Sequence, residues 1–409
     1  MALRKKLFGD DVYMNIFLAA HYNLNNGDRA LLEATVGIIK RLAPDSKLTV
    51  SAYIPKKLND RRFTTVNWAL RNGLYEKILL RLSEIKKFRI IFRKYYRIIC
   101  DSKYISAIEN ADIVFISGGH HLTDILSNRG YYKLSSNFIV PILMGKKIIL
   151  LPQTIGPAEN NDIIKSIKWI LKKSYSVAYR DQSSSDFIKK INARCNNRYV
   201  PDLAFSLYPN KSNICREKTV GIALYHCYVD DRRKTILPFT LSNLVKVIDE
   251  LLNRRYKVLV IPMDRGDEKV YTDLYNKVNY KLKNESLSIA CKGDSINELI
   301  DKFRGLSFVL AYKTHSVVFS LICNTPLIAI AYHPKSREFM DNIGLGEYSV
   351  DDRDASYEKL IELINRLEDR IEEVKKTELV GVNDNRLLID DYLKEIFSDI
   401  DRISKKNKT

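Results

Sequence analysis

Short apolar runs alternate with stretches of helical spacing along most of the chain. An apolar run of about four to eight residues is typical of a buried strand, and apolar residues three and four positions apart are typical of one helix face. Strands are predicted at Val12–Ala20, Leu48–Ile54, Asp112–Ile116, Lys147–Leu151 and Ser176–Tyr179, and again at Thr219–Leu224, Lys257–Pro262, Leu287–Ala290, Phe308–Ala311 and Leu327–Ala331. Alternating strands and helices favour parallel sheets with right-handed crossovers.

A polar stretch, Tyr208–Lys218, separates the two series of strands and is typical of a linker. The pattern therefore predicts an N-terminal Rossmann-like domain over 1–207, a linker over 208–218 and a C-terminal Rossmann-like domain over 219–380. The last segment, 381–409, is expected to be a helix with a basic tail. Its apolar residues keep helical spacing: Leu388, Tyr392, Ile396, Ile400 and Ile403.

The chain carries 67 Lys and Arg against 49 Asp and Glu, a formal net charge of +18. Such an excess implies attraction to an anionic partner, which could be a nucleic acid, a membrane surface or a phosphorylated substrate. No zinc-finger spacing and no aromatic RNP-like strand occurs, so no nucleic-acid partner is expected.

Much of the positive charge lies in the segment 71–104, which also has an apolar stripe. The stripe has the spacing of one helix face: Leu74, Ile78, Leu82, Ile85, Phe88, Phe92, Tyr95 and Ile99. The segment could be a surface helix packed on its own domain. It could also be a peripheral contact with an anionic membrane.

The N-terminus lacks a signal-peptide pattern, and no apolar run reaches the ~20 residues that span a bilayer. We therefore expect a cytoplasmic protein. Its six cysteines form no CxxC pair and no zinc spacing, so they are expected to be reduced, and no metal site is predicted.

Cationic residues follow two successive strands between Ser307 and Lys335. Lys313, Thr314 and His315 come directly after one strand and open a helix, and Lys335 follows the next strand. Ligands of open α/β sheets bind at the carboxyl ends of strands, where a helix N-terminus attracts anions. The cluster predicts a site for a small, doubly anionic ligand. His226, after the first strand of this domain, is a further candidate for an anion contact or a structural residue.

Polar residues also follow strands in the N-terminal half. Asp28 could cap a helix beginning near Arg29 or bind a sugar hydroxyl. Gly118 and Gly119, before His120, would let a ligand or helix approach the backbone closely. Gln153 could form a hydrogen bond at the sheet edge.

Arg180 ends the fifth predicted strand. Its guanidinium could bind a carboxylate or phosphate through two parallel hydrogen bonds, or it could form a structural pair with Asp181.

The order of these motifs resembles that of the polysaccharide pyruvyl transferase family. The motifs that carry the resemblance are Asn25-Asn26-Gly27-Asp28, Ser117-Gly118-Gly119, Leu151-Pro152-Gln153-Thr154-Ile155-Gly156-Pro157, Arg180-Asp181 with Ser183–Ser185, Val200-Pro201-Asp202, and Lys313-Thr314-His315 with Tyr332-His333-Pro334-Lys335. The resemblance implies a GT-B-like fold, in which two Rossmann-like domains with parallel sheets face a cleft.

The resemblance implies an enzyme that transfers pyruvate from phosphoenolpyruvate to two hydroxyls of one sugar, with no cofactor and no metal. It implies that His315, Arg180 and Lys335 are catalytic, and that phosphoenolpyruvate contacts Lys313, Thr314, Arg180, Lys335 and His226. The N-terminal domain would bind the acceptor through Asn25, Asp28, Gly118, Gly119, His120 and Gln153. The family usually has Arg where this chain has Lys313. A guanidinium that could bind an anion through two parallel hydrogen bonds is thus replaced by a single ammonium.

The acceptor expected from the resemblance is a polysaccharide or a lipid-linked precursor, with a 4,6-ketal on a galactose-type hexose. Two other classes stay open. A GT-B glycosyltransferase would use a nucleotide sugar instead of phosphoenolpyruvate. A non-enzymatic anion- or nucleic-acid-binding protein would owe its charge to phosphate contacts.

Overall fold

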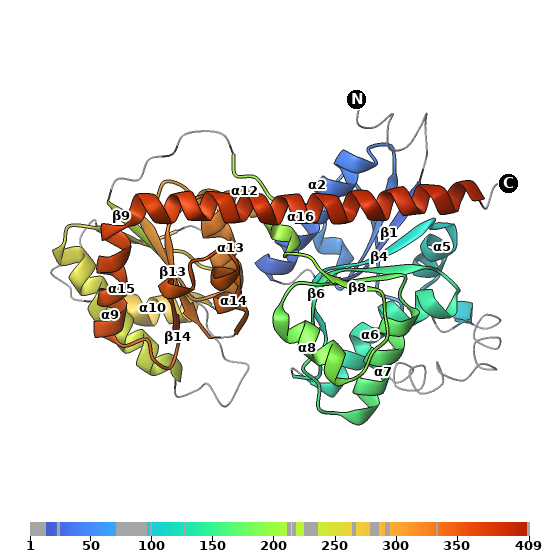
Figure 1. Ribbon diagram of the computed structural model, residues 1–409, viewed down its shortest axis with the longest axis horizontal. Coiled ribbons are helices and arrows are strands. Elements are labelled where there is room, and N and C mark those ends of the chain that lie inside the picture. The colour runs from blue at the N-terminus through green and yellow to red at the C-terminus, as the bar shows by residue number, and fades with distance from the viewer. Residues whose placement is uncertain are drawn as a thin grey trace. The chain divides into compact units, whose positions relative to one another are not determined.

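The computed structural model describes residues 14–22, 25–70, 96–98, 100–125, 127–210, 214, 218–224, 236–263, 267–278, 286–290, 295–332 and 334–406. The chain forms two compact units. Unit 1 comprises Met1–Ser206 and Arg386–Thr409, and unit 2 comprises Leu207–Asn385. Figure 1 shows helices packed around a sheet in each unit.

Unit 1 is built on an eight-stranded parallel sheet. Its elements are β1 (Asn15–His21), α2 (Asn26–Leu42), β2 (Lys47–Ala52), η1 (Pro55–Lys57), β3 (Thr64–Val66), α5 (Ser102–Asn110), β4 (Ile113–Ile116), β5 (Gly119–Leu122), α6 (Asn128–Leu143), β6 (Ile148–Ile155), α7 (Asn161–Lys173), β7 (Ser176–Tyr179), α8 (Gln182–Lys190), β8 (Asn197–Tyr199) and η2 (Leu203–Ser206). The strand order is β3-β2-β1-β4-β6-β7-β8, and β5 pairs with β6. Successive strands are therefore added on one side of β1 up to β3 and on its other side from β4 onward, so the switch point of this sheet lies between β1 and β4.

Unit 2 is built on a six-stranded parallel sheet. Its elements are β9 (Thr219–Ala223), α9 (Ile236–Asn253), β10 (Lys257–Val260), α10 (Asp267–Lys277), β11 (Leu287–Ile289), α12 (Ile296–Asp301), β12 (Phe308–Ala311), α13 (Thr314–Ile322), β13 (Leu327–Ala331), α14 (Pro334–Asn342), η4 (Gly346–Tyr348), β14 (Ser349–Asp351), α15 (Tyr357–Asp369) and the first part of α16 (Ile371–Lys406). The order β11-β10-β9-β12-β13-β14 is that of a Rossmann fold, with its switch point between β9 and β12.

The predicted α/β class with two parallel sheets is confirmed. Each predicted strand has a counterpart within a few residues, and β7, β12 and β13 have the predicted bounds. The sequence did not predict β3, β5, β8 and β14, which are three or four residues long. β5 has the sequence GHHL, whose polar histidines give no apolar run.

The C-terminal helix α16 begins at Ile371, before the expected segment 381–409. Its residues from Arg386 onward belong to unit 1. There the Phe397 ring lies 5.8 Å from that of Phe115, and the Tyr392 hydroxyl lies 3.3 Å from Ser176 Oγ. Leu388 was expected on the apolar face but is 45% exposed, because the neighbouring Ile389 takes the buried position.

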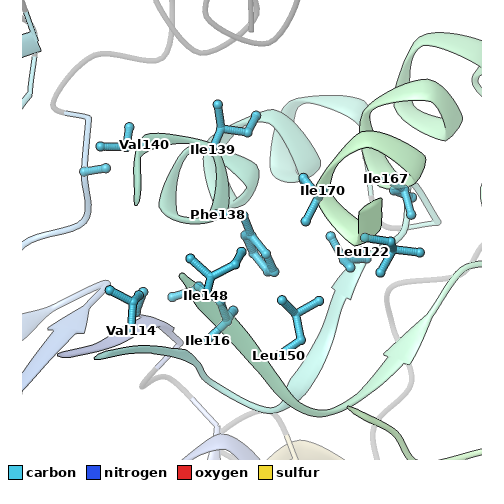
Figure 2. Close-up of a cluster of buried hydrophobic side chains, with 14 of the residues drawn as sticks. Val114, Ile116, Leu122, Phe138, Ile139, Val140, Ile148, Leu150, Ile167 and Ile170 are labelled. Atoms are coloured by element: carbon cyan, nitrogen blue, oxygen red, sulfur yellow. The ribbon is translucent and has the colours of Figure 1, made fainter. Parts of the chain in front are cut away.

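A cluster of buried apolar side chains holds α6 and α7 on one face of the first sheet (Figure 2). The ring of Phe138, on α6, points toward the strands among side chains of β4, β5 and β6. These are Val114, Ile116, Leu122, Ile148 and Leu150. Burying an aromatic ring of this size contributes about 1.5–3 kcal/mol relative to leaving it exposed.

Two sequence predictions lie wholly or mainly outside the described residues. The basic amphipathic stripe falls within 71–95 except for Ile99, and neither part is described. His226 is also outside the described part of the chain. The helices in that described part include none with both the length and the apolarity that crossing a bilayer requires.

Replacing Phe138 by Ala should lower the free energy of unfolding of unit 1 by about 3–5 kcal/mol, because it leaves a cavity under α6. The chain has two tryptophans, Trp68 and Trp169, both in unit 1, so urea unfolding followed by tryptophan fluorescence reports on that unit. Leu387→Ala is the matched control, since Leu387 is 62% exposed and should change stability by less than about 0.5 kcal/mol. Equal effects of the two substitutions would contradict this description of the core.

Candidate functional site

In unit 2 the carboxyl ends of β12 and β13 lie side by side, because the two strands pair in parallel from Val309 opposite Leu327. Helix α13 begins at Thr314, three residues after β12 ends, and α14 begins at Pro334, three residues after β13 ends. Parallel pairing therefore brings the N-termini of two helices to the same sheet edge. This edge adjoins the switch point between β9 and β12.

A hydrogen bond joins the two helix N-termini. Thr314 Oγ1 lies 3.2 Å from Ser336 Oγ, and both residues are buried. Lys313 precedes Thr314 as the N-cap of α13, and its side chain makes no capping hydrogen bond. Lys335 precedes Ser336 in α14. Both lysines are buried, so two cationic residues stand at the carboxyl ends of these strands beside two positive helix ends.

Aromatic packing fixes the backbone on either side of these lysines. Tyr312 donates a hydrogen bond to Asp352 Oδ2 at 2.9 Å, and its ring stacks on Tyr332 with 5.6 Å between centroids. The ring of His315, the second residue of α13, lies 6.3 Å from the Phe319 ring. Two cations and helix N–H groups held in this way can bind an anion with more than one charged group.

Arg180 follows β7 in unit 1, and its guanidinium is buried. It forms an ion pair with Asp202 through Nη1, and its Nε donates to Thr154 Oγ1 at 3.2 Å. Asp202 also accepts from the Ala204 N–H at 2.9 Å, which fixes the carboxylate. Asp181 caps α8 by accepting from the Ser184 N–H at 2.9 Å. Burial makes the Arg180–Asp202 pair sensitive to loss of either partner.

The N-terminus of α2 differs from the expectation. The helix begins at Asn26 and its cap is Asn25, whose side-chain oxygen accepts from the Asp28 N–H at 2.7 Å. Asp28 is instead in the first turn and accepts from Asn25 Nδ2 at 2.6 Å. The expected capping role of Asp28 is therefore wrong, because its own N–H is the group that is capped.

Protein atoms surround the glycine pair that follows β4. A Cβ on Gly118 would lie 2.8 Å from the Pro152 carbonyl oxygen. A Cβ on Gly119, whose φ is +150°, would lie 2.5 Å from Nε2 of His121. His120 Nε2 lies 2.7 Å from the Gly156 carbonyl oxygen. The glycines thus give room to a neighbouring strand and an imidazole of the same unit.

Three buried polar side chains lie at the carboxyl ends of β1, β5 and β6: His21, His121 and Gln153. Burial, and then the charge of His121, lower the pKa of His21 to about 3. Burial, and then the charge of Arg180, lower the pKa of His121 to about 3. Sequence reasoning proposed Gln153 but gave no role to the two histidines. The rule that polar residues at strand ends mark a site would have found His21.

The predicted site residues thus fall into two groups. Unit 2 brings together Lys313, Thr314 and Lys335, with His315 in the same turn of α13. Unit 1 carries the others that are described: Asn25, Asp28, Gly118, Gly119, His120, Gln153 and Arg180.

A cavity of about 370 Å³ lies in unit 1 at the amino ends of the strands. Its lining includes Asn15, Lys47 and Thr64, the first residues of β1, β2 and β3. It is therefore separate from the strand carboxyl ends. Across the described residues, no group of three or more His, Cys, Asp or Glu side chains could hold a metal ion.

The family model of polysaccharide pyruvyl transferases matches residues 25–334 of the chain, which is more than half of its length. The amylovoran biosynthesis protein AmsJ of Erwinia amylovora is 21% identical over 410 residues, covering 92% of this chain and 97% of that protein.

Solved structures share the fold at low sequence identity. Anabaena Alr3699/HepE in complex with UDP and glucose has a TM-score of 0.55 at 10% identity, covering 97% of this chain and 100% of that one. A glycosyltransferase from Rickettsia africae has a TM-score of 0.57 at 14% identity, covering 95% and 99%. A putative UDP-N-acetylglucosamine 2-epimerase from Listeria monocytogenes has a TM-score of 0.58 at 9% identity, covering 91% and 94%. The predicted GT-B-like fold class is confirmed by this likeness.

The two buried histidines should make unit 1 less stable as the pH falls. Their folded pKa of about 3 lies below the ordinary 6.5, so the unfolded chain takes up protons between these values that the folded chain does not. Stability is therefore fully present above pH 6.5 and falls below it, by up to about 1.4 kcal/mol per pH unit for each histidine. Urea unfolding between pH 7.5 and 4.5, followed by tryptophan fluorescence, measures the slope.

The variants His21→Gln and His121→Gln should each flatten that slope relative to the wild type. Above pH 7 the slopes should coincide, because both imidazoles are then neutral in either state, and this range is the internal control. Identical slopes of all three proteins below pH 6 would show that the histidines titrate alike in the folded and unfolded chains.

Proposed function

Because the chain belongs to the polysaccharide pyruvyl transferase family, we propose that it transfers pyruvate from phosphoenolpyruvate to two hydroxyls of one hexose and releases phosphate. The chain is thus an enzyme of the pyruvyltransferase kind. One observation carries the proposed donor: two buried lysines, Lys313 and Lys335, stand at adjacent helix N-termini joined through Thr314 and Ser336.

In phosphoenolpyruvate the carboxylate is bonded to C2, and the phosphate is bonded to the enol oxygen on the same carbon. The lysines would neutralise these groups, and the first N–H groups of α13 would donate hydrogen bonds to one of them. Lys313 stands where the family usually has Arg. An ammonium keeps the charge of the contact and loses the two parallel hydrogen bonds of a guanidinium. Arg180, carried by unit 1, remains predicted to be essential, with Asp202 fixing its guanidinium.

His315 is the proposed general acid. It would give a proton to the C3 methylene, so that the double bond is lost and C2 becomes an oxocarbenium ion. One sugar hydroxyl then forms a C–O bond to C2 and loses its proton. The C2–O bond to phosphate breaks, and a second hydroxyl closes the ketal. Overall, one hydroxyl proton ends on the new methyl group and the other on phosphate. Acid catalysis of this kind contributes about 10²–10⁴-fold.

The proposed acceptor is a cell-surface polysaccharide or its lipid-linked precursor. The family itself implies a polysaccharide, and the AmsJ relative is named for amylovoran biosynthesis. Within this class we propose a galactose-type hexose that receives a 4,6-ketal. The reaction would take place in the cytoplasm, where phosphoenolpyruvate is available.

Phosphoenolpyruvate should raise the unfolding temperature of the purified protein, because a ligand that binds only the folded state stabilises it by mass action. At about 100 times the dissociation constant the stabilisation is about 2.7 kcal/mol. Lys335→Met should weaken the affinity at least tenfold, while Lys313→Arg should keep it because the charge remains. His315→Gln should keep the stabilisation but abolish acceptor-dependent phosphate release. Thermal scans over a ligand titration give the affinities.

Arg337→Met is the matched control for Lys335→Met, since Arg337 lies on the same helix and is exposed. It should bind phosphoenolpyruvate like the wild type. UDP-glucose and inorganic phosphate complete the ligand panel. Stabilisation by UDP-glucose with none by phosphoenolpyruvate would replace the proposed donor by a nucleotide sugar.

We also propose that the basic segment 71–104 contacts an anionic membrane, which would bring the enzyme to a lipid-linked acceptor. Flotation with vesicles should recover the protein with 30% phosphatidylglycerol and leave it unbound with neutral lipid, since each basic residue near an anionic surface contributes about 1 kcal/mol. Changing Lys86, Lys87 and Arg89 to Glu should weaken recovery at least tenfold. The matched control reverses three exposed lysines of α7: Lys165, Lys168 and Lys172. Equal recovery of both variants would exclude the segment.

A further inference from the structure

Several buried polar atoms of unit 1 have no hydrogen-bond partner among the described residues. They are both ring nitrogens of His21, Nδ1 of His121, and both amide atoms of Gln153. Buried polar groups are almost always paired, because an unpaired one loses its hydrogen bonds to water and gains none in return. Five such atoms at one sheet edge therefore require an explanation, and a ligand that pairs with them is one.

The three side chains belong to one region. His21 ends β1, beside the β1–β4 switch point at which open sheets bind ligands. The charge of His121 acts on His21, and that of Arg180 acts on His121. Gln153 lies opposite Gly119 in the β5–β6 pairing, and its carbonyl accepts from the Arg180 N–H at 3.1 Å.

Aromatic rings adjoin His21 on the side of β2 and β3. The Trp68 Nε1–H donates to the His21 carbonyl at 3.2 Å. The Tyr53 ring lies 5.0 Å from Trp68 and 5.4 Å from Tyr22, between ring centroids. Tyr53 is 37% exposed, and Lys133 Nζ lies 4.5 Å from its ring centroid. Tyr22 and Tyr53 directly follow β1 and β2, so they share the strand edge with His21.

This combination matches an uncharged sugar better than an anion. A neutral imidazole and an amide each offer a donor and an acceptor, as a hydroxyl does, whereas a phosphate or carboxylate needs donors only. Arg180, the cation next to His121, is already paired with Asp202. The apolar C–H face of a pyranose can pack on tyrosine rings, which supply contact area beside a polar group.

We propose that His21, His121 and Gln153, with Tyr22 and Tyr53 beside them, form a subsite that binds the hydroxyl groups of a neutral pyranose. Identifying that pyranose as the acceptor sugar rests on the proposed function. The subsite itself rests on the unpaired buried atoms. Gln153 was already expected from the family resemblance to bind the acceptor. His21 and His121 are added here because each has a buried ring nitrogen with no hydrogen-bond partner among the described residues.

Binding of simple sugars tests the subsite. The probes are methyl β-D-galactopyranoside, methyl β-D-glucopyranoside and methyl α-D-mannopyranoside, at up to 100 mM, with phosphoenolpyruvate in parallel. At least one pyranoside should raise the unfolding temperature and change the tryptophan fluorescence, because Trp68 contacts His21. Gln153→Met and His21→Phe should each weaken that binding at least tenfold and leave the phosphoenolpyruvate response unchanged. Gln182→Met makes the same exchange at an exposed position of α8 and should bind like the wild type.

The stability of the free variants gives a second readout. Gln153→Met removes an unpaired amide, so its unfolding temperature should equal or exceed that of the wild type. Asn137→Leu removes a buried amide that is paired, since Asn137 Oδ1 accepts from the Ala69 N–H at 3.2 Å, and it should lower the unfolding temperature. Equal losses in the two variants would mean that Gln153 has a structural partner, and would overturn the proposal.

The outcomes separate the two proposals. No pyranoside binding by the wild type, or equal binding by Gln153→Met and His21→Phe, overturns the subsite even if phosphoenolpyruvate binds. Pyranoside binding that the variants lose, without any response to phosphoenolpyruvate, supports the subsite and overturns the proposed donor.

Discussion

Parallel pairing of the strands is the constraint on which both sites depend. Every pair of named strands in the two sheets is parallel, so all of the strands in a sheet end at the same edge. The residue that follows each strand is thereby delivered to that edge. In unit 2 this brings Lys313 and Lys335 together from positions 22 residues apart in the chain. A slip of one residue in this register would turn each side chain to the other face of the sheet.

The two strand edges treat charge differently. In unit 2, two buried lysines and two helix N-termini lie at the carboxyl ends of β12 and β13. In unit 1, the cation Arg180 is compensated by Asp202, and burial holds His21 and His121 in their neutral form. The proposed reaction, between a highly charged donor and an uncharged sugar, would use one environment for each substrate.

The sequence was most informative where a strand is fully apolar and a helix follows at once. Those conditions hold for β12 and β13, so Lys313 and Lys335 could be placed correctly at strand ends. β5 does not meet these conditions, because its two histidines interrupt the apolar run by which a strand is predicted. His21 directly followed the first predicted strand, which was expected to end at Ala20, but it was given no role. The helix cap at Asn25 was missed because Asn25 and Asp28 can both cap, and only the backbone geometry distinguishes them.

Local sequence patterns could not predict contacts between residues that are distant in the chain. Arg180 was weighed against Asp181, its neighbour, whereas its ion pair reaches Asp202. That pairing depends on how the segment after β8 returns to the carboxyl end of β7. The return of α16 to unit 1 was likewise not visible, because amphipathic spacing indicates that a face is buried but not what covers it.

Core packing and the polar edge of unit 1 are physically coupled through His121. Its ring lies 6.4 Å from that of Phe138 in an edge-to-face arrangement, so the apolar cluster under α6 limits where the imidazole can lie. Gly119 leaves room for the imidazole, since the Cβ of any larger residue there would overlap the ring. Each buried polar group that is left unpaired costs about 1–3 kcal/mol. Such a group would therefore normally move to form a hydrogen bond with the nearest partner. Close packing around His121 opposes that movement, and the proposed subsite would therefore lose little further freedom when a ligand binds.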